Sequence, residues 1–510
     1  MSEKHFVISL EKGIDKQEIM DELSRDTTSD VNVDSNIIPD RQVQTVNNRP
    51  SSKRMFEMAL TEDEVSKLRN DSRVGDINEP LVWDDEWLDY ERSGTGNWAR
   101  TPGTSNRNNW GLLRHIEQTN GWGSSVGSNR ADKYSYHLDG SGVDFINQEG
   151  SIARPDHVQW QDSNGQSRYQ QFQWNTLPNM GGMGTVSYSG TGGGHATHCC
   201  GTVVSKDYGW ATGANIYSLG LNSHNQSYWF DAIKEFHKAK APDPFTGVKR
   251  PTVINASWGY RSTWSNITNI YFRGTNTGTT AVNRSYGMIG DTADRFNAQL
   301  YNLMAEVEEM QDEGVIYCKS AGNQRQKLCG QGDIDYNNYI TKSSSTGGIS
   351  AGQPVYYNRG AGNIGPDTIV VGNIDSYLFN GQEATQTGSD KGPRVDVWAA
   401  GTNIISSYNN SASATADLTG TSMATPQVSG MTCLLLQMNP GMTPAQVRSW
   451  WHNNAVQNLL YVGPNNENDP ATFFNNDRNL MGGVNRIAYF PYNAHRNLEV
   501  QVQMTHGKFG

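Results

Sequence analysis

Three polar residues that lie far apart in the chain have the side chains that acyl transfer requires. Ser422, in "LTGTSMATP", precedes a strongly apolar run, and His195, in "GGGHATHCC", follows a run of glycines. Asn323, in "YCKSAGN", follows another apolar run. A serine can act as nucleophile, a histidine as its general base, and an asparagine amide as a donor to the oxyanion. Together they predict nucleophilic acyl transfer, although Ser422 taken alone would be an ordinary N-capping residue.

The local sequence places each of these residues at the end of an expected helix or strand. We expect one helix from Ser422 to about Met438 and another that begins at His195. The N-terminus of the Ser422 helix would present backbone N–H groups to developing negative charge. Asn323 would follow the carboxyl end of a strand.

Strand-like and helical runs alternate from about residue 131 onward. The strand-like runs include "NIYSLGL", "PTVINASWG", "GVIYCKSAGN", "DTIVVGNI" and "RVDVWAAG". A helix is expected in "RFNAQLYNLMAEVEEMQDEG", where one face holds Leu300, Leu303, Met304, Val307 and Met310 and where Gly314 supplies a C-cap. This alternation predicts an α/β fold with a mainly parallel sheet and with its chemistry at the carboxyl ends of the strands.

At 510 residues the chain is too long for one ordinary domain. Residues 1–82 predict a small α+β unit of the split βαβ, ferredoxin-like type, in which Thr61 and Glu64 form a capping box. Residues 83–130 are rich in Gly, Ser and Asn and predict an exposed linker and N-terminal arm. We expect the main domain at 131–455 and a C-terminal extension packed on it at 456–510.

The overall composition argues against several classes of function. The net charge of −11 and the pI of about 5.5 disfavour nucleic acid as a partner, since a phosphate-binding surface needs concentrated Lys and Arg. Mean hydropathy is −0.66, and no apolar run approaches the roughly 20 residues needed to span a membrane. The N-terminus lacks the apolar core of a secretory signal peptide, and five cysteines are too few for a disulfide framework.

Four motifs, in order along the chain, resemble those of the subtilisin-like serine proteases. They are "GHATHCCGTV", "VINASWG", "SAGN" and "GTSMATP", and the resemblance extends from about Asn108 to Val447. It implies a subtilisin-like sheet with helices on both faces, and an inhibitor-like propeptide in the first 82 residues. The absence of a signal peptide is compatible with an intracellular or phage-encoded member, and the localisation stays open.

Carried across by motif, the resemblance implies a serine endopeptidase that is made as a self-inhibited zymogen. Ser422 would be the nucleophile, His195 the base and Asn323 an oxyanion donor. A protein or peptide substrate would bind as an extended strand, and the chain's own prodomain would be a second partner. The residues expected to bind the substrate are Ser257, Trp258, Gly259, Ala321 and Gly322.

The acid that orients the histidine is sought in "HLDGSGVDFINQEG", which contains three carboxylates. In the family a strand ends on an aspartate that is followed by Ser or Thr, Gly, an aliphatic residue and often an acid. "SGVD" at 141–144 matches the residues after that aspartate, so we expect Asp139 to be the triad acid, with one extra turn residue at Gly140. On this register Asp144 and Glu149 are loop residues without a catalytic role.

Other interpretations compete with a protease. "HATHCC" places His195, His198 and Cys199 at a spacing compatible with zinc, but the sequence offers no convincing fourth ligand, so we expect no metal in the site and no cofactor. The acidic pairs Asp84/Asp85 and Asp333/Asp335 could hold a structural Ca²⁺, with solvated loops as the simpler account. The third alternative is a catalytically weak or inactive structural or binding protein on the same fold, suggested by the irregular turn after Asp139.

Overall fold

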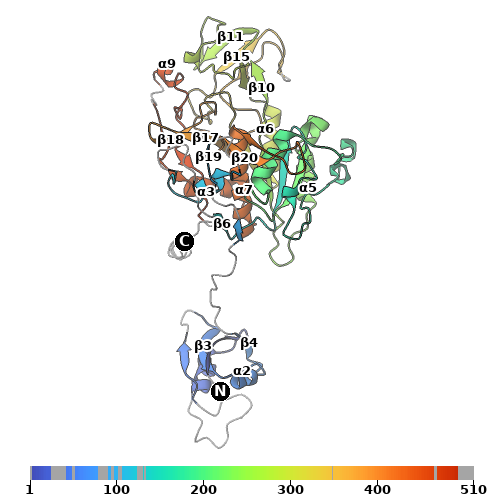
Figure 1. The fold of residues 1–510 in the computed structure, drawn as a ribbon, viewed down its shortest axis with the longest axis vertical. Coiled ribbons are helices and arrows are strands. Elements are labelled where there is room, and N and C mark those ends of the chain that lie inside the picture. Colours follow the sequence, from blue (N-terminus) through green and yellow to red (C-terminus); the bar gives the residue numbers. More distant parts are fainter. Residues whose placement is uncertain are drawn as a thin grey trace, which may run out of the picture. The chain divides into compact units, whose positions relative to one another are not determined.

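The computed structural model describes most of the chain, as two compact units (Figure 1). The described residues are 3–24, 42–48, 52–78, 90–92, 97–101, 106–122, 130, 134–346, 349–463 and 468–491. One unit covers Met1–Leu88 and the other Asp89–Gly510.

The N-terminal unit is a four-stranded sheet with two helices. Its elements, in order, are β1 (Lys4–Leu10), α1 (Lys16–Ser24), β2 (Thr45–Asn47), β3 (Met55–Leu60), α2 (Glu62–Leu68) and β4 (Val74–Asn78). The strand order is β2-β3-β1-β4, and all neighbours are antiparallel. Alternate residues of β1 and β3 are buried and form the core with one side of each helix. The predicted capping box is confirmed, because Thr61 and Glu64 each bond the other's backbone N–H.

The second unit is built on a mainly parallel sheet, as predicted. The strand order is β22-β23-β19-β17-β14-β9-β7-β8, and β18 pairs with β17. All pairings from β8 to β23 are parallel, whereas β18 and β22 pair antiparallel. The strands are β7 (Asp144–Glu149), β8 (Asn215–Gly220), β9 (Thr252–Ala256), β14 (Ile316–Ser320), β17 (Ile369–Phe379), β18 (Gln382–Thr385), β19 (Val397–Ala400), β22 (Val456–Gln457) and β23 (Arg486–Ile487).

Helices cover both faces of this sheet. Neighbouring residues of a strand point to opposite faces, and since both are apolar in β9, each face needs a cover. Val253 of β9 packs in one hydrophobic cluster with α4 (Gly194–Val204) and α7 (Thr421–Met438). The next residue, Ile254, packs in a second cluster with α5 (Asp231–Lys238) and α6 (Tyr301–Asp312). The remaining helices are α3 (Trp110–Arg114), α8 (Pro444–Asn454) and α9 (Pro470–Phe473).

Smaller sheets lie outside the main one. The strands β11 (Ile267–Phe272), β12 (Thr275–Asn276), β15 (Tyr339–Lys342) and β16 (Val355–Tyr356) form one sheet, and β10 (Arg261–Thr263) pairs with β13 (Arg295–Asn297). Two further two-stranded sheets pair β20 (Ile404–Ser407) with β21 (Thr415–Leu418), and β5 (Tyr90–Arg92) with β6 (Tyr134–Tyr136). The helix expected from residue 295 therefore begins only at Tyr301, and the residues before it include β13.

Two segments that were expected to lie outside the main domain contribute to its core. Residues 97–122 were expected in an exposed linker, but Trp98, Trp110 and Trp122 are all buried in the main hydrophobic cluster. The Trp122 indole N–H donates to the Trp98 carbonyl at 2.7 Å. At the other end, β23 pairs with β19 inside the main sheet, so part of 456–510 belongs to the central sheet.

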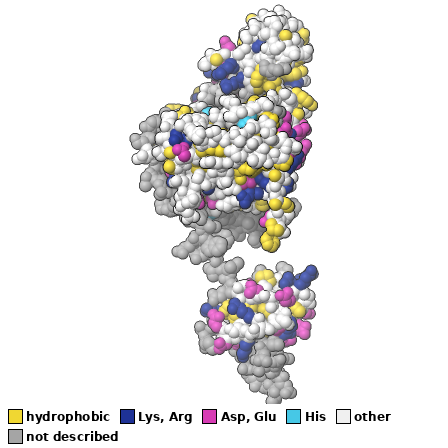
Figure 2. Space-filling view, turned by 90° about the vertical axis from the view of Figure 1, so that its right-hand side faces the viewer, with side chains coloured by type: hydrophobic (Ala, Val, Ile, Leu, Met, Phe, Trp, Pro, Cys, Tyr) yellow, Lys and Arg dark blue, Asp and Glu magenta, His cyan; other side chains and the backbone are white. Residues whose placement is uncertain are grey.

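The surface carries no broad field of one sign on the face seen in Figure 2, where acidic and basic side chains are interspersed among uncharged ones. None of the helices in the described part of the chain combines the length and the apolar character needed to cross a membrane.

Candidate active site

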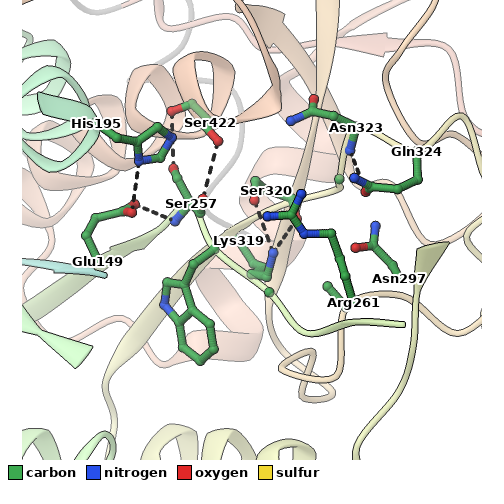
Figure 3. Close-up of a pocket in the computed structure, with 14 residues that line it drawn as sticks. Glu149, His195, Ser257, Arg261, Asn297, Lys319, Ser320, Asn323, Gln324 and Ser422 are labelled. Carbon is green, nitrogen blue, oxygen red and sulfur yellow. Dashed lines mark hydrogen bonds and ion pairs between the residues drawn. The ribbon is translucent and has the colours of Figure 1, made fainter. Parts of the chain in front are cut away.

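A cavity of about 360 Å³ lies where the sequence places the catalytic residues (Figure 3). Strands β7, β9 and β14 are neighbours in the sheet, and the residues at or just beyond their carboxyl ends line the cavity together with the first turns of α4 and α7. The lining residues are Glu149, His195, Ser257, Trp258, Gly259, Arg261, Asn297, Lys319, Ser320, Gly322, Asn323, Gln324, Ala361 and Ser422. The carboxyl ends of parallel strands are the usual position of sites in open α/β sheets.

The acid beside His195 is Glu149, the last residue of β7. Its Oε2 lies 3.1 Å from His195 Nδ1, and its Oε1 accepts from the Ser257 backbone N–H at 2.9 Å. The Glu149 side chain is 3% exposed, whereas the His195 ring is 47% exposed on its cavity side. Two donors thus fix the carboxylate, which can hold the imidazole in the tautomer that leaves Nε2 free to accept a proton.

The prediction for Asp139 is wrong. Its Oδ1 accepts from Gln437 Nε2 at 3.1 Å and from the Ser141 N–H at 2.9 Å, and its carbonyl accepts from Gly213 N–H at 2.6 Å. Asp139 precedes β7, whereas the site lies at the far end of that strand. Five residue steps of an extended strand cover roughly 17 Å, so no bulge at Gly140 brings the carboxylate to His195.

Asp144 also lies at the wrong end of β7. It pairs with Lys240 at 2.7 Å and accepts from Asn215 Nδ2 at 2.8 Å. The prediction that Glu149 is a loop residue is wrong for the same reason as the prediction for Asp139. "SGVD" stands at the start of β7, whereas the family pattern places it after the end of a strand. A signal was present, since the family's acid ends a strand and Glu149 ends "DFINQE" before Gly150.

Ser422 lies at the start of α7, as predicted, and is the second residue of the helix after Thr421. Its hydroxyl donates to the Ser257 carbonyl at 3.3 Å, and the described residues show no hydrogen bond between it and His195. His195 and Ser422 face the same space in Figure 3. Rotation of the serine about χ1 re-aims its hydroxyl, and hydrogen bonds of this kind often tighten only when substrate binds.

Asn323 is held with its amide nitrogen available. Its Oδ1 accepts from the Thr421 backbone N–H at 3.0 Å and from the Thr421 hydroxyl at 3.1 Å. Since the oxygen is occupied, Nδ2 is the atom that can donate into the cavity beside Ser422. The Ser422 backbone N–H is in the first helical turn, where it has no intrahelical acceptor. The pair is suited to an oxyanion.

The surroundings of His195 favour its protonated form. The Cys199 sulfur, 3.8 Å from Nδ1, and the Glu149 carboxylate raise the pKa of His195 well above its ordinary value, against the opposing effect of burial. Burial raises the pKa of the Cys199 thiol, which also donates to the Ser422 carbonyl at 3.2 Å. Glu149, whose Oε2 lies 3.1 Å from Nδ1, is the carboxylate partner of the imidazole.

Four of the five residues predicted to bind substrate line the cavity: Ser257, Trp258, Gly259 and Gly322. Ala321 is fully buried, bonds the Val371 carbonyl through its N–H, and is not among the lining residues. Gly322 has φ +120°, and a Cβ there would collide with the Asn297 and Asp390 side chains. Only glycine fits this position.

The residues of the two metal alternatives take part in other contacts. His198 Nε2 lies against the carbonyls of Ile404 and Ala416, at 3.0 and 3.1 Å, away from His195. Glu149, His195 and Cys199 have ligand atoms within 4.8 Å of one another, but their hydrogen bonds to each other, to Ser257 and to Ser422 occupy them. Asp333 and Asp335 both pair with Lys327, at 2.8 and 2.9 Å, so a lysine occupies the place of a cation. Asp84 and Asp85 lie outside the described residues.

Sequence reasoning missed the other side of the cavity, which is lined by Arg261, Asn297, Lys319, Ser320, Gln324 and Ala361. A lysine inside the apolar strand "IYCKS" was the available signal, because a fully buried lysine is rare unless it is paired.

Comparisons with known proteins agree with these motifs. The model of the subtilase family matches residues 141–485. The chain is 26% identical over 292 residues to cerevisin of Saccharomyces cerevisiae. This aligned region covers 54% of this chain and 35% of that protein. It is 25% identical over 368 residues to a subtilisin-like serine protease of Cochliobolus lunatus, with 71% and 56% covered. A similar protease of Rhodotorula mucilaginosa is 28% identical over 271 residues, with 50% and 59% covered.

The chain thus spans between about a third and three fifths of the length of these relatives. Among solved structures, a cold adapted subtilisin-like serine proteinase aligns with 75% of this chain and 98% of its own, at 18% identity and a TM-score of 0.44.

Proposed function

Since the chain belongs to the subtilase family, whose model matches residues 141–485, we propose that it is a serine endopeptidase with Ser422, His195 and Glu149 as its triad. The observation that carries this proposal is the contact of Glu149 Oε2 with His195 Nδ1 at 3.1 Å, in the cavity that also holds Ser422.

The position of each group determines its part in the reaction. A peptide lies extended along Ser257–Gly259, the segment that continues β9. The Ser422 hydroxyl attacks the carbonyl carbon while His195 Nε2 takes its proton, and Glu149 stabilises the imidazolium through Nδ1–H. Asn323 Nδ2 and the Ser422 N–H stabilise the oxyanion.

The same histidine completes both halves of the reaction. When the tetrahedral species collapses, His195 gives its proton to the leaving amine, and the C–N bond breaks. Water then attacks the acyl-enzyme, His195 takes the water proton, and Ser422 recovers a proton as the acid departs.

Labelling of Ser422 with a fluorophosphonate probe tests this function. We expect a single adduct on a Ser422 peptide by mass spectrometry, and no adduct in Ser422→Ala. An unlabelled Ser422 in the processed protein, beside a labelled control protease, would refute the proposal. The alternative of an inactive protein on this fold was based on the irregular turn after Asp139. Since Glu149 and not Asp139 lies beside His195, that turn gives no reason to expect inactivity.

We also propose that the N-terminal unit is a prodomain that blocks the site until the enzyme cuts the chain. The support is the family membership and the compact fold of residues 1–88. The mass spectrum of the matured protein, beside a Ser422→Ala control, tests this. The same cut in the mutant would show that another protease makes it.

A further inference from the structure

The side of the cavity formed by β14 and β10 holds two cations. Lys319 of β14 is 1% exposed, and its amine donates to the Ser320 carbonyl at 2.7 Å and to the Ser320 hydroxyl at 3.1 Å. Arg261 of β10 lines the same cavity, and Figure 3 shows its guanidinium beside Lys319 and Ser320. Lys319 forms no ion pair with any described residue, and such a buried unpaired cation is costly.

Glu149 and Asp390 are the nearby carboxylates, and neither forms an ion pair with Lys319 among the described residues. Glu149 is bound by His195 and by the Ser257 N–H. Asp390 lies behind the cavity wall, where one oxygen accepts from the N–H groups of Gln324 and Gln326 and the other from Asn297 Nδ2.

The position of Lys319 relative to the reacting atoms determines which part of a substrate it meets. Lys319 and Ser320 end the strand that leads directly to Asn323, the oxyanion donor. The residue whose carbonyl is attacked carries its side chain on the adjacent Cα. Ser422 and Asn323, which would meet the carbonyl carbon and oxygen, line the same cavity as Lys319 (Figure 3).

We propose that this cavity selects an acidic side chain, Glu or Asp, on the residue whose carbonyl Ser422 attacks. The inference rests on the proposed protease function and adds its substrate class. The carboxylate would accept from Lys319 Nζ and lie near the Arg261 guanidinium, while Trp258 and Ala361 offer apolar wall to its methylene groups.

The electrostatics of the cavity agree with this assignment. Burial and the positive charge of Arg261 lower the pKa of Lys319 to about 7, although Glu149 and Asp390 act in the opposite direction. A bound carboxylate adds a direct negative partner, which favours the charged amine.

The experiment compares peptides that differ only in the residue before the cut, carrying Glu, Gln or Leu there. Glu and Gln have nearly the same shape, so the ratio of their kcat/KM values isolates the charge. With the protein processed from the full chain we expect Glu to exceed Gln by roughly tenfold to a hundredfold, as for a hydrogen bond to a charged group. Lys319→Met should reduce this ratio to below about threefold, and Arg261→Gln should reduce it in part.

Lys238→Met, which removes a charge from an exposed position on α5, is the matched control and should keep the wild-type ratio. A wild-type ratio near one, or a preference for Leu, overturns the acidic preference. If Ser422 still reacts with the fluorophosphonate probe, only this inference fails. If no peptide is cut and Ser422 is not labelled, the protease function itself fails.

Discussion

The two sides of the cavity differ in how their charges are balanced. On the β7 side the Glu149 carboxylate is bound by His195 and by the Ser257 N–H, so the charge is compensated without substrate. On the β14 side Lys319 has only the oxygens of Ser320, and the charge of Arg261 lies nearby.

This contrast is consistent with different roles for the two sides, catalysis on the β7 side and substrate selection on the β14 side. A base must be oriented before substrate arrives, so its acid is fixed in advance. A specificity pocket discriminates between substrates when one of its buried polar groups is paired only by the preferred substrate. A substrate that lacks the matching group leaves that polar group unpaired, which costs binding free energy.

The largest effect is expected from Glu149→Gln. The amide keeps the shape but no longer fixes the imidazole tautomer, so kcat should fall by about 10⁴-fold. Asp139→Asn is the matched control and should stay within about threefold of wild type, as expected for a residue outside the catalytic constellation. Steady-state kinetics on one peptide measure both. A large loss in Asp139→Asn with none in Glu149→Gln would restore the sequence-based assignment.

Stability should distinguish the unpaired lysine from a paired one. In a Ser422→Ala background, which prevents self-digestion, Lys319→Met should raise the free energy of unfolding by about 1–4 kcal/mol, because it replaces a buried unpaired charge. Lys327→Met, which leaves Asp333 and Asp335 without their shared partner, should lower it by about 3–5 kcal/mol. Urea unfolding followed by tryptophan fluorescence measures both. Destabilisation by Lys319→Met to the same extent as Lys327→Met would contradict the contrast.

The pKa of His195 should lie above the ordinary value of about 6.5. Because only neutral imidazole can act as base, the acid limb of the kcat/KM profile should lie above that pH as well. The raised pKa stabilises the fold fully below about pH 6.5 and loses this contribution as pH rises through the folded-state value. NMR titration of His195 in Ser422→Ala should show a lower pKa after Glu149→Gln, and an unchanged pKa would contradict the ion pair.

The smallest effect is expected in the pH dependence of the acidic preference. Lys319 has a pKa of about 7 in the cavity, where it faces Arg261, Glu149 and Asp390. Above that pH a carboxylate must bind together with a proton, so the Glu to Gln ratio should fall by up to about tenfold per pH unit until the Lys319 contribution is lost. His195 affects both peptides equally and cancels in the ratio. A flat ratio from pH 6 to 9 would argue that Lys319 does not contact the substrate.

Much of the fold and of the reacting centre could be predicted from sequence. Ser422, His195 and Asn323 are found because each has a local signal, namely a helix start, a glycine run or a strand end. Glu149 was missed because the choice among three acids depends on where β7 starts, and "SGVD" matched the family pattern at the wrong end. Lys319 could not be placed because its burial and its lack of an ion partner depend on side chains from other elements.

The tryptophan-rich segment before the main domain determines where the chain can be shortened. The Arg100 guanidinium lies over the rings of Trp110 and Trp122, at 4.4 and 4.3 Å from their centres, and also pairs with Glu383 of β18. A mature enzyme that keeps its hydrophobic centre must therefore begin no later than about residue 97. A recombinant protein begun at residue 131, the boundary that composition suggests, would lack Arg100 and both tryptophans and should fail to fold stably.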